Sequence, residues 1–371
     1  MTALRVVTFI GGLMVAGWGM LAAVKTVVLP RGDVNMLTKA VFFTTGRLFR
    51  LLASERREYV ARDRVMALYA PVSLVLLPFA WAFTVAMGFT LMFWSLGGRT
   101  GFEAFSLSGS SLLTLGFVRA ESFWDHVLVF AEATAGLGIV ALLISYLPTM
   151  YNAFSRRERE VALLEVRAGS PPSAVELLIR FHRIGWADSY SALWDDWERW
   201  FAEVDETHTS YPPLVFFRSP QPDRSWITAG GAVLDSAALI NAALDIPHDP
   251  SADICLRAGY IALRHVAAFF GIVFDPDPSP TDPVSITRAE FDEAIETLAS
   301  NGVPLRDDRD AAWAAFAGWR VNYDTVLLSL AELTMAPYAP WTSDRSAPGQ
   351  RRTVFRRWGP RHGPALETPI D

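Results

Sequence analysis

The chain has 371 residues, of which 51% are hydrophobic and only 19% are charged, whereas soluble globular proteins carry about 25% charged residues. No charged residue occurs in residues 6–24, 65–98 or 133–155, and each stretch is long enough for a transmembrane helix, which needs roughly 18 apolar residues. The pattern excludes a wholly soluble protein and a disordered one. The single cysteine, Cys255, excludes an intrachain disulfide scaffold, and the net charge of −6 argues against a nucleic-acid partner.

The first apolar stretch predicts a retained N-terminal transmembrane helix, which we place at residues 1–30. Only Arg5 provides a positive start, and the uncharged run is longer than the roughly 7–15 residues of a signal-peptide core. Together with the other two stretches, it predicts an all-α membrane protein with three transmembrane helices.

The positive charges predict the topology. Residues 31–64 contain eight lysines and arginines, and residues 156–159 contain three arginines. Because positive residues favour the cytoplasmic side, both segments are expected there. The second and third helices then cross outward and back, residues 99–125 face outside, and the N-terminus is outside. The Ala- and Arg-rich, Lys-poor composition favours a bacterial-type inner membrane, with lipid as a partner.

Residues 31–64 are predicted to be a cytosolic amphipathic linker. Apolar residues at 41–43, 48–49 and 51–52 are interleaved with Arg47 and Arg50. This pattern fits either a helix on the inner membrane surface or a helix packed on the cytosolic domain. The second apolar stretch would reach about 51 Å as one helix against a core of roughly 30 Å. We therefore expect a kink or an interfacial start at Pro71 and Pro78.

The segment between the second and third apolar stretches is the most informative part of the chain. Residues 104–118 are uncharged but too short to span a membrane, which favours a re-entrant segment. Residues 102–113 predict a helix of about three turns. The motif Thr114-Leu115-Gly116-Phe117-Val118 follows directly.

Residues 65–155 resemble the two-transmembrane potassium channel family, a branch of the pore-loop cation channels. Thr114, Leu115, Gly116 and Phe117 match the Thr-x-Gly-aromatic filter motif of that family. The resemblance implies a pore domain over 65–155 and a homotetramer. Backbone carbonyls of residues 114–118 would replace the hydration shell of K⁺ or another monovalent cation. It also implies an inner-helix hinge at Gly136 or Gly138, although both glycines are equally compatible with helix packing.

The sequence departs from the family pattern after Phe117. Val118 stands where the family has its second glycine, and a β-branched residue resists the backbone angles that glycine allows. Arg119 stands where an acid usually follows, so it brings positive charge to the pore mouth unless Glu121 or Asp125 neutralises it. Selective potassium conduction, weakly selective cation conduction and a non-conducting membrane-anchored scaffold or sensor therefore all remain open.

An acidic residue within an apolar helix is costly unless it has a partner or faces water. Glu132 lies near the start of the third apolar helix. It either contacts the ion directly or hydrogen-bonds the pore helix and supports the filter, and we favour the second interpretation.

The C-terminal part is predicted to be a helical cytosolic domain over residues 156–344, followed by a disordered basic tail over 345–371. Helices are expected at 155–168, after Ser173, at 191–204, 226–244, 254–270 and 287–300, and as one long helix at 308–335. Ser173 with Glu176 and Thr287 with Glu290 predict helix caps, and the aromatic residues of 191–204 have a three-and-four spacing that predicts core packing. The sequence contains no phosphate-binding glycine loop and no recognisable metal-ligand or catalytic motif. We therefore expect no enzymatic activity, no metal and no cofactor besides permeant ions. The cytosolic domain is expected to gate the channel, with a cytosolic regulator of unknown identity as a partner.

Overall fold

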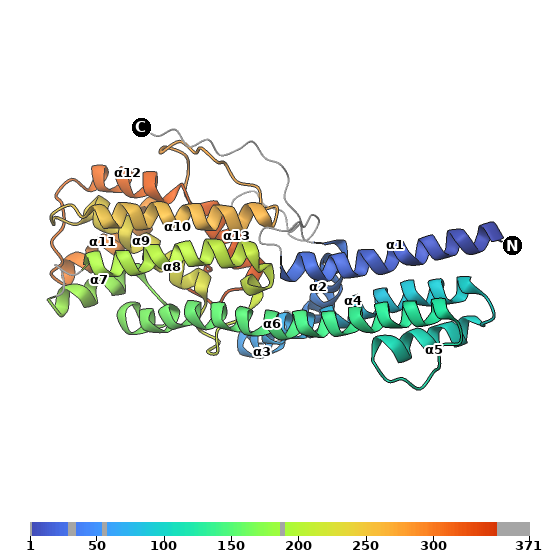
Figure 1. The fold of residues 1–371 in the computed structure, drawn as a ribbon. Helices are drawn as coiled ribbons and strands as arrows, with labels where there is room; N and C mark the ends of the chain where they lie inside the picture. The colour runs from blue at the N-terminus through green and yellow to red at the C-terminus, as the bar shows by residue number, and fades with distance from the viewer. Residues whose placement is uncertain (1, 29–34, 54–57, 186–189, 347–371) are drawn as a thin grey trace. The chain divides into compact units, whose positions relative to one another are not determined.

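The computed structural model describes residues 2–28, 35–53, 58–185 and 190–346 (Figure 1). The described residues are helical and contain no strand, apart from one isolated bridge between Leu244 and Leu305. Three helical segments are long and apolar enough to cross a membrane, Ala3–Val27, Tyr59–Leu96 and Phe123–Ala168. The predicted all-α class with three membrane-spanning candidates is confirmed, and the chain is compatible with a multi-pass membrane protein.

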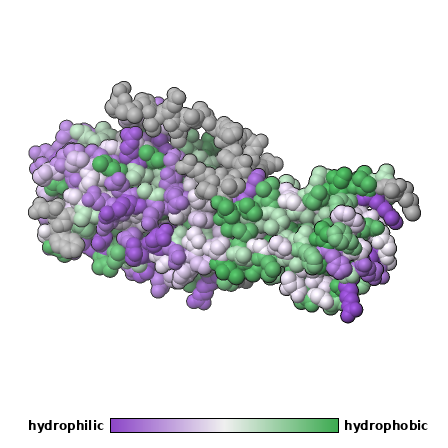
Figure 2. All heavy atoms as spheres, in the orientation of Figure 1, coloured by the Kyte–Doolittle hydropathy of each residue, from purple (hydrophilic) through white to green (hydrophobic). Residues whose placement is uncertain are grey.

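The chain forms two compact units. The N-terminal unit comprises Met1–Ser54 and Val65–Asn152, and the C-terminal unit comprises Glu55–Arg64 and Ala153–Asp371. Figure 2 shows hydrophobic residues gathered over the helices of the first unit and hydrophilic residues over the second. Each unit is described separately below.

In the N-terminal unit, α1 (Thr2–Val27) packs against α4 (Tyr69–Leu96) through small residues. A Cβ added to Gly12 would lie 2.5 Å from the carbonyl oxygen of Gly88, so only glycine allows this approach. Arg5 lies beside Gly97 at the end of α4, which makes the two helices antiparallel. The start of α1 therefore lies at the same end of the unit as the loop that follows α4.

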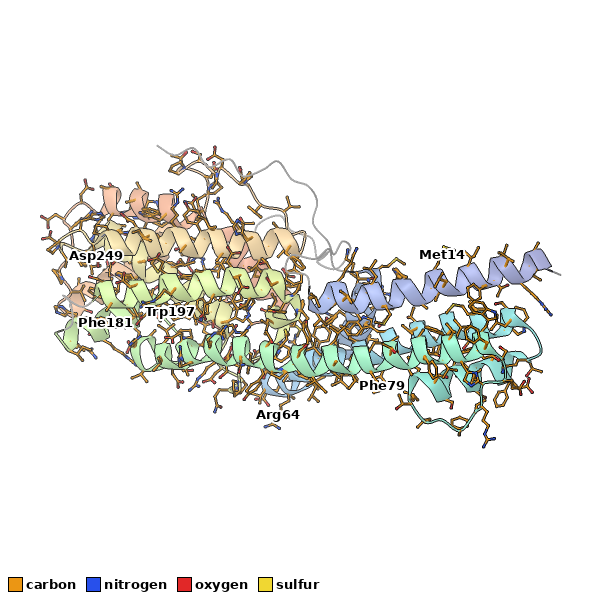
Figure 3. The ribbon with its side chains drawn as sticks, in the orientation of Figure 1. Met14, Arg64, Phe79, Phe181, Trp197 and Asp249 are labelled. Atoms are coloured by element: carbon orange, nitrogen blue, oxygen red, sulfur yellow. The ribbon has the colours of Figure 1, made fainter. Side chains whose placement is uncertain are left out.

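The opposite faces of these two helices are apolar and uncovered within the unit. Met14 of α1 is 65% exposed and Phe79 of α4 is 68% exposed, and both are labelled in Figure 3. Exposed apolar side chains are the normal outer surface of a helix that contacts lipid.

The predicted kink of the second apolar stretch lies at a different residue from either proline. The stretch begins in the last turn of α3 (Tyr59–Ala67), and α4 starts at Tyr69 after a break at Leu68. Pro71 lies in the first turn of α4, where its missing N–H group leaves no helical hydrogen bond unmade. Pro78 is accommodated inside the helix.

The amphipathic helix expected in the linker is α2 (Met36–Leu52), whose first turn is capped by Asn35. Its buried face packs within the N-terminal unit, where the Tyr69 hydroxyl donates to the Phe42 carbonyl at 3.1 Å. The hydroxyls of Thr45 and Ser73 lie 2.7 Å apart. Residues 31–34 and 54–57 of the predicted linker fall outside the described residues.

The C-terminal unit includes the start of α3 and the last part of α6 (Phe123–Ala168). Its further helices are α7 (Ala174–Arg183), α8 (Tyr190–Ser210), η2 (Pro212–Phe216), α9 (Trp226–Ala243), α10 (Pro250–Phe269), α11 (Arg288–Ser300), α12 (Arg309–Arg320) and α13 (Asp324–Thr334). The aromatic stripe of α8 is core, as predicted, with Trp194, Trp197 and Phe201 buried. Trp197 is labelled in Figure 3, as is Phe181 of α7, whose ring stacks on Tyr190.

The single long helix predicted over residues 308–335 is wrong. The chain breaks between α12 and α13, at residues 321–323. The break lets Arg320 and Tyr323 both donate to the buried carboxylate of Asp235 while Arg320 also binds Asp324. Residues 321–323 contain no glycine or proline. The helix ends here because of these tertiary hydrogen bonds and not because of a helix-breaking residue.

Helix caps were predicted with mixed success. Thr287 and Glu290 form the expected reciprocal capping box at the start of α11. Ser173 caps α7 by accepting from the Glu176 amide, whereas the Glu176 side chain pairs with Arg180. Arg345, the first residue of the predicted basic tail, pairs with Glu290, and residues 347–371 lie outside the described residues.

Candidate functional site

The candidate site is the segment between α4 and α6, which contains the short helix α5 (Gly101–Leu112). The Thr100 hydroxyl accepts from the Glu103 amide, and the Glu103 carboxylate accepts from the Thr100 amide, so the helix begins with a capping box. The expected short helix over 102–113 is therefore confirmed within one residue at each end. The Thr-x-x-Glu spacing in the sequence could have located its start.

An ion pair fixes the two ends of this segment together. Both Nη atoms of Arg99, after α4, donate to the carboxylate of Asp125 in the first turn of α6, at 2.8 and 2.9 Å. The Asp125 side chain is 3% exposed, and it also accepts from the Ser122 amide. Two parallel N–H···O bonds fix both distance and orientation. Sequence reasoning gave Arg99 no role.

The helix α5 is held between α4 and α6 through one hydroxyl. Ser108 Oγ lies 3.0 Å from the Ala86 carbonyl oxygen of α4 and 2.5 Å from Glu132 Oε1 of α6. Glu132 is completely buried, and its Oε2 has no partner within the described residues. The predicted hydrogen bond between Glu132 and the short helix is present. Ser108 was missed as its partner, because nothing local to residue 132 indicates which serine lies opposite.

Residues 113–118 turn back onto the end of α5. The amides of Leu115 and Gly116 both donate to the Ser110 carbonyl, at 2.8 and 3.3 Å. The Val118 amide donates to Ser110 Oγ at 3.2 Å. Thr114 and Gly116 have positive φ angles of 55° and 71°, so the backbone turns sharply twice within three residues.

The carbonyl oxygens of this segment have a different environment from its amides. Within the described part of the chain, no hydrogen bond is accepted by a carbonyl of residues 113–118. Leu115 and Phe117 are 61% and 67% exposed, although both are apolar. Within the described residues, the segment therefore presents carbonyl oxygens without donors and uncovered apolar side chains.

The residues after the motif show how the sequence departs from the family pattern. Val118 does not have a positive φ, unlike Thr114 and Gly116. Arg119 is exposed. Of the two acids expected to neutralise it, Asp125 is bound to Arg99, and Glu121 lies 4.0 Å from the same guanidinium. The positive charge of Arg119 therefore has no ion-pair partner among the described residues.

Gly136 and Gly138, the two hinge candidates, have different surroundings. A Cβ added to Gly136 would lie 2.1 Å from the carbonyl oxygen of Leu112, at the end of α5. The nearest atom to a Cβ at Gly138 would be Met20 Cε at 3.9 Å, an ordinary contact. Gly136 thus allows α6 to approach the end of the short helix, which is a packing role, whereas Gly138 has free space beside it.

The comparisons with known proteins found no matching family model, no matching curated protein and no matching solved structure. Among the described residues, no three His, Cys, Asp or Glu side chains come together in a way that could hold a metal ion. What the candidate site does is therefore inferred from the geometry of its own residues.

Proposed function

We propose that the chain is the protomer of a homotetrameric pore-loop cation channel in the cell inner membrane, with its C-terminal unit in the cytoplasm. K⁺ or another monovalent cation would pass along the carbonyl oxygens of residues 114–118. The C-terminal unit, which contains the last part of α6, would bias the channel between open and shut.

The observation that carries this proposal is that the backbone amides and the backbone carbonyls of residues 113–118 have different hydrogen-bond partners. The amides of Leu115, Gly116 and Val118 hold the segment on α5, whereas no donor among the described residues reaches its carbonyls. Carbonyl oxygens that replace the hydration shell of an ion are the ligands of a cation filter. Four copies around an axis would supply the ring and would cover the exposed Leu115 and Phe117.

The two supports of α5 fit the same proposal. Ser108 connects the short helix to both α4 and α6, and the Arg99–Asp125 pair closes the loop at its ends. A filter must keep its ligands in place while ions pass, and a short helix bound to two neighbouring helices within a closed loop is suited to that task. Glu132 is then a support of the filter and not an ion ligand.

Selectivity is expected to be weaker than in the family that the sequence resembles. Val118 lacks the positive φ of the two filter residues before it, so the outermost carbonyl site would not be reproduced. Arg119 would add four positive charges near the entrance of the tetramer, which opposes cation entry.

The unpaired charge of Arg119 favours a second candidate function. With Asp125 occupied by Arg99, no acid neutralises Arg119 within the described residues. A non-conducting membrane-anchored scaffold or sensor would retain the loop without needing to attract cations. In that case the C-terminal unit would bind a partner, and the loop would serve only assembly.

Cation flux from liposomes tests the two candidates. The full-length protein is reconstituted with K⁺ or Na⁺ gradients, next to Gly116→Ala and Gly98→Ala. Both glycines have positive φ and open space around them, so they differ mainly in whether they lie in the filter motif. We expect Gly116→Ala to reduce flux at least tenfold and Gly98→Ala to leave it near the wild-type value.

The K⁺/Na⁺ flux ratio then measures the effect of Val118, and Arg119→Gln should raise cation flux. A verified tetramer that shows no flux, including with Arg119→Gln, would reject the channel and favour the scaffold. A monomer would reject the channel directly.

A further inference from the structure

The helix α3 begins in one unit and ends in the other. Residues 55–64 belong to the C-terminal unit, and the chain enters the N-terminal unit at Val65. After a break at Leu68 it continues as α4, the helix whose Ala86 carbonyl holds the short helix α5. A contact that holds the start of α3 in the C-terminal unit is therefore connected, through the chain, to α4, which supports the candidate filter.

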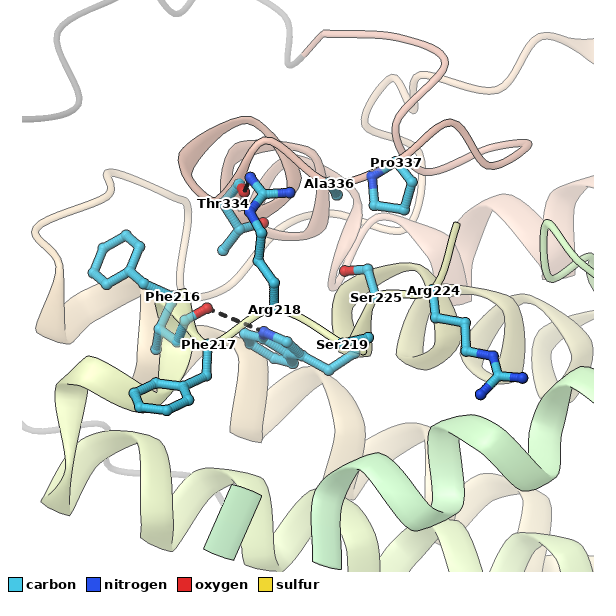
Figure 4. Close-up of a pocket in the computed structure, with 11 residues that line it drawn as sticks. Phe216, Phe217, Arg218, Ser219, Arg224, Ser225, Thr334, Ala336 and Pro337 are labelled. Atoms are coloured by element: carbon cyan, nitrogen blue, oxygen red, sulfur yellow. Dashed lines mark hydrogen bonds between the residues drawn. The ribbon is translucent and has the colours of Figure 1, made fainter. Parts of the chain in front are cut away.

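That fastening is made by Arg218, which lies between η2 and α9. Its Nη1 donates to Asp63 Oδ1 of α3 at 2.5 Å, and its Nη2 donates to the Thr334 carbonyl at 2.6 Å. Both Nη atoms also lie 3.3 Å from the Met335 carbonyl. Figure 4 shows the Arg218 side chain extending toward Thr334.

The charges around Arg218 complement its own. Asp63 supplies a carboxylate, and Thr334 and Met335 lie at the C-terminus of α13, where the helix dipole is negative. The side chains of Arg218 and Asp63 are only 11% and 10% exposed. An ion pair so shielded from water costs more to break than a surface pair, because the remaining partner is left buried and uncompensated.

We propose that Arg218 is a positioning residue that couples the C-terminal unit to the outer helix α4 through Asp63 of α3. The C-terminal unit would then act on both helices that hold α5, on α6 by direct continuity and on α4 through this clamp. The consequence for conduction rests on the proposed channel function, whereas the mechanical link does not.

Hydrogen exchange of the full-length protein in lipid nanodiscs tests the link without requiring ion flux. The variants are Asp63→Asn, Arg218→Gln and the double variant. Arg345→Gln is the control, because it removes an arginine that forms a more exposed ion pair, with Glu290, in the same unit. The readouts are the amides of residues 58–67, in α3, and 68–76, at the start of α4.

We expect each single variant to raise exchange at least tenfold in both segments, while helices α8 to α10 keep their protection. The double variant should exchange no faster than Arg218→Gln alone, since that single variant already removes the contact with Asp63. Arg345→Gln should leave both segments unchanged. Unchanged exchange at 68–76, or a uniform rise over the whole C-terminal unit, would overturn the proposal.

Flux measurements on the same variants separate this proposal from the channel itself. If the wild type conducts, Asp63→Asn and Arg218→Gln should change flux at least threefold without altering the K⁺/Na⁺ ratio, because the filter is untouched. Wild-type flux from both variants, despite faster exchange, would overturn the coupling. If the wild type does not conduct, the channel fails, and the exchange pattern alone decides whether the clamp exists.

Discussion

The two units of this protein are packed by different means. In the N-terminal unit, helices approach through glycines and backbone atoms, as Gly12 does with Gly88 and Gly136 with the Leu112 carbonyl. In the C-terminal unit, helices pack through large side chains, such as the rings of His208 on α8 and Trp226 on α9, 4.7 Å apart, and Gly259 faces the side chains of Leu234 and Phe201. Fully buried charged groups are concentrated in the second unit, where Arg320 is completely inaccessible.

Lipid and water favour these two kinds of packing. Lipid tails are as apolar as leucine, so helices in a membrane gain little by burying apolar side chains and associate through close van der Waals contact of small residues. In water, burying aromatic area is strongly favourable, and a paired charge can be enclosed where its hydrogen bonds are satisfied. Substitutions in the two units should therefore destabilise the protein for different physical reasons.

The largest expected effect is in the C-terminal unit, at Arg320. Replacing it with methionine leaves Asp235 and Asp324 buried without their shared cation, which should lower the free energy of unfolding by about 3–5 kcal/mol. Denaturation of the solubilised full-length protein, followed by hydrogen exchange in residues 226–335, measures the loss. Arg199→Met is the control, because its pair with Asp196 is exposed and should cost at most about 1 kcal/mol. Equal losses would contradict a core role for the network.

In the N-terminal unit, the sharpest contrast is between two glycines of the same helix. Gly136→Ala would force α6 away from the Leu112 carbonyl, 2.1 Å from the new Cβ, at a cost of about 1–3 kcal/mol. Gly138→Ala meets only Met20 at 3.9 Å and should be neutral or slightly stabilising. Thermal denaturation in detergent measures both. If Gly138→Ala proved the more damaging, the packing role of Gly136 would be wrong and the free space at Gly138 would be functionally important.

A pH-dependent effect is expected at His208, which is fully buried beside Arg157. Because a guanidinium can only donate, His208 Nε2 accepts the hydrogen bond from Arg157. The Thr207 hydroxyl donates to the Glu203 carbonyl and therefore accepts from His208 Nδ1. Burial, aided by the Arg157 charge, holds the pKa of His208 well below its usual 6.5.

The unfolded chain therefore takes up a proton on this histidine before the folded one does. Stability should fall below about pH 6.5, by about 1.4 kcal/mol per pH unit, until the folded pKa is reached. The measurement is the difference between wild type and His208→Gln in denaturant titrations from pH 7.5 to pH 5. A parallel pH dependence in the two proteins would show that His208 is not the group responsible.

The smallest expected effect is at Glu290, at the start of α11. Its hydrogen bond from Arg345 lowers the pKa of Glu290 to about 2. A lowered pKa stabilises the fold above the ordinary value near 4.5, and the contribution is lost as pH falls toward 2. Because Glu290 is partly exposed, Glu290→Gln should cost below about 1 kcal/mol at pH 7. Titration of the Glu290 carboxyl by NMR checks the pKa, and a normal value would exclude the ion pair in solution.

Most of the helices could be predicted because their signals are local. The Thr287–Glu290 capping box and the three-and-four spacing of aromatic residues in α8 are short patterns, and both are as expected in the structure. The break between α12 and α13 could not be predicted, because Arg320 and Tyr323 turn toward Asp235, more than 80 residues away in the chain. The partners of Arg99 and Glu132 were missed for the same reason.

The sequence by itself determined the helical class, the three membrane-spanning candidates and the Thr-x-Gly-aromatic loop, because hydropathy and helical periodicity act over one or a few turns. Only the tertiary structure decided that Asp125 neutralises Arg99, that Arg119 has no ion-pair partner in the described part of the chain, that α1 packs on α4, and that Arg218 fastens α3. These contacts join residues from 26 to 155 positions apart. A charge in a sequence has many possible partners, and the one it meets is selected by the packing of whole helices.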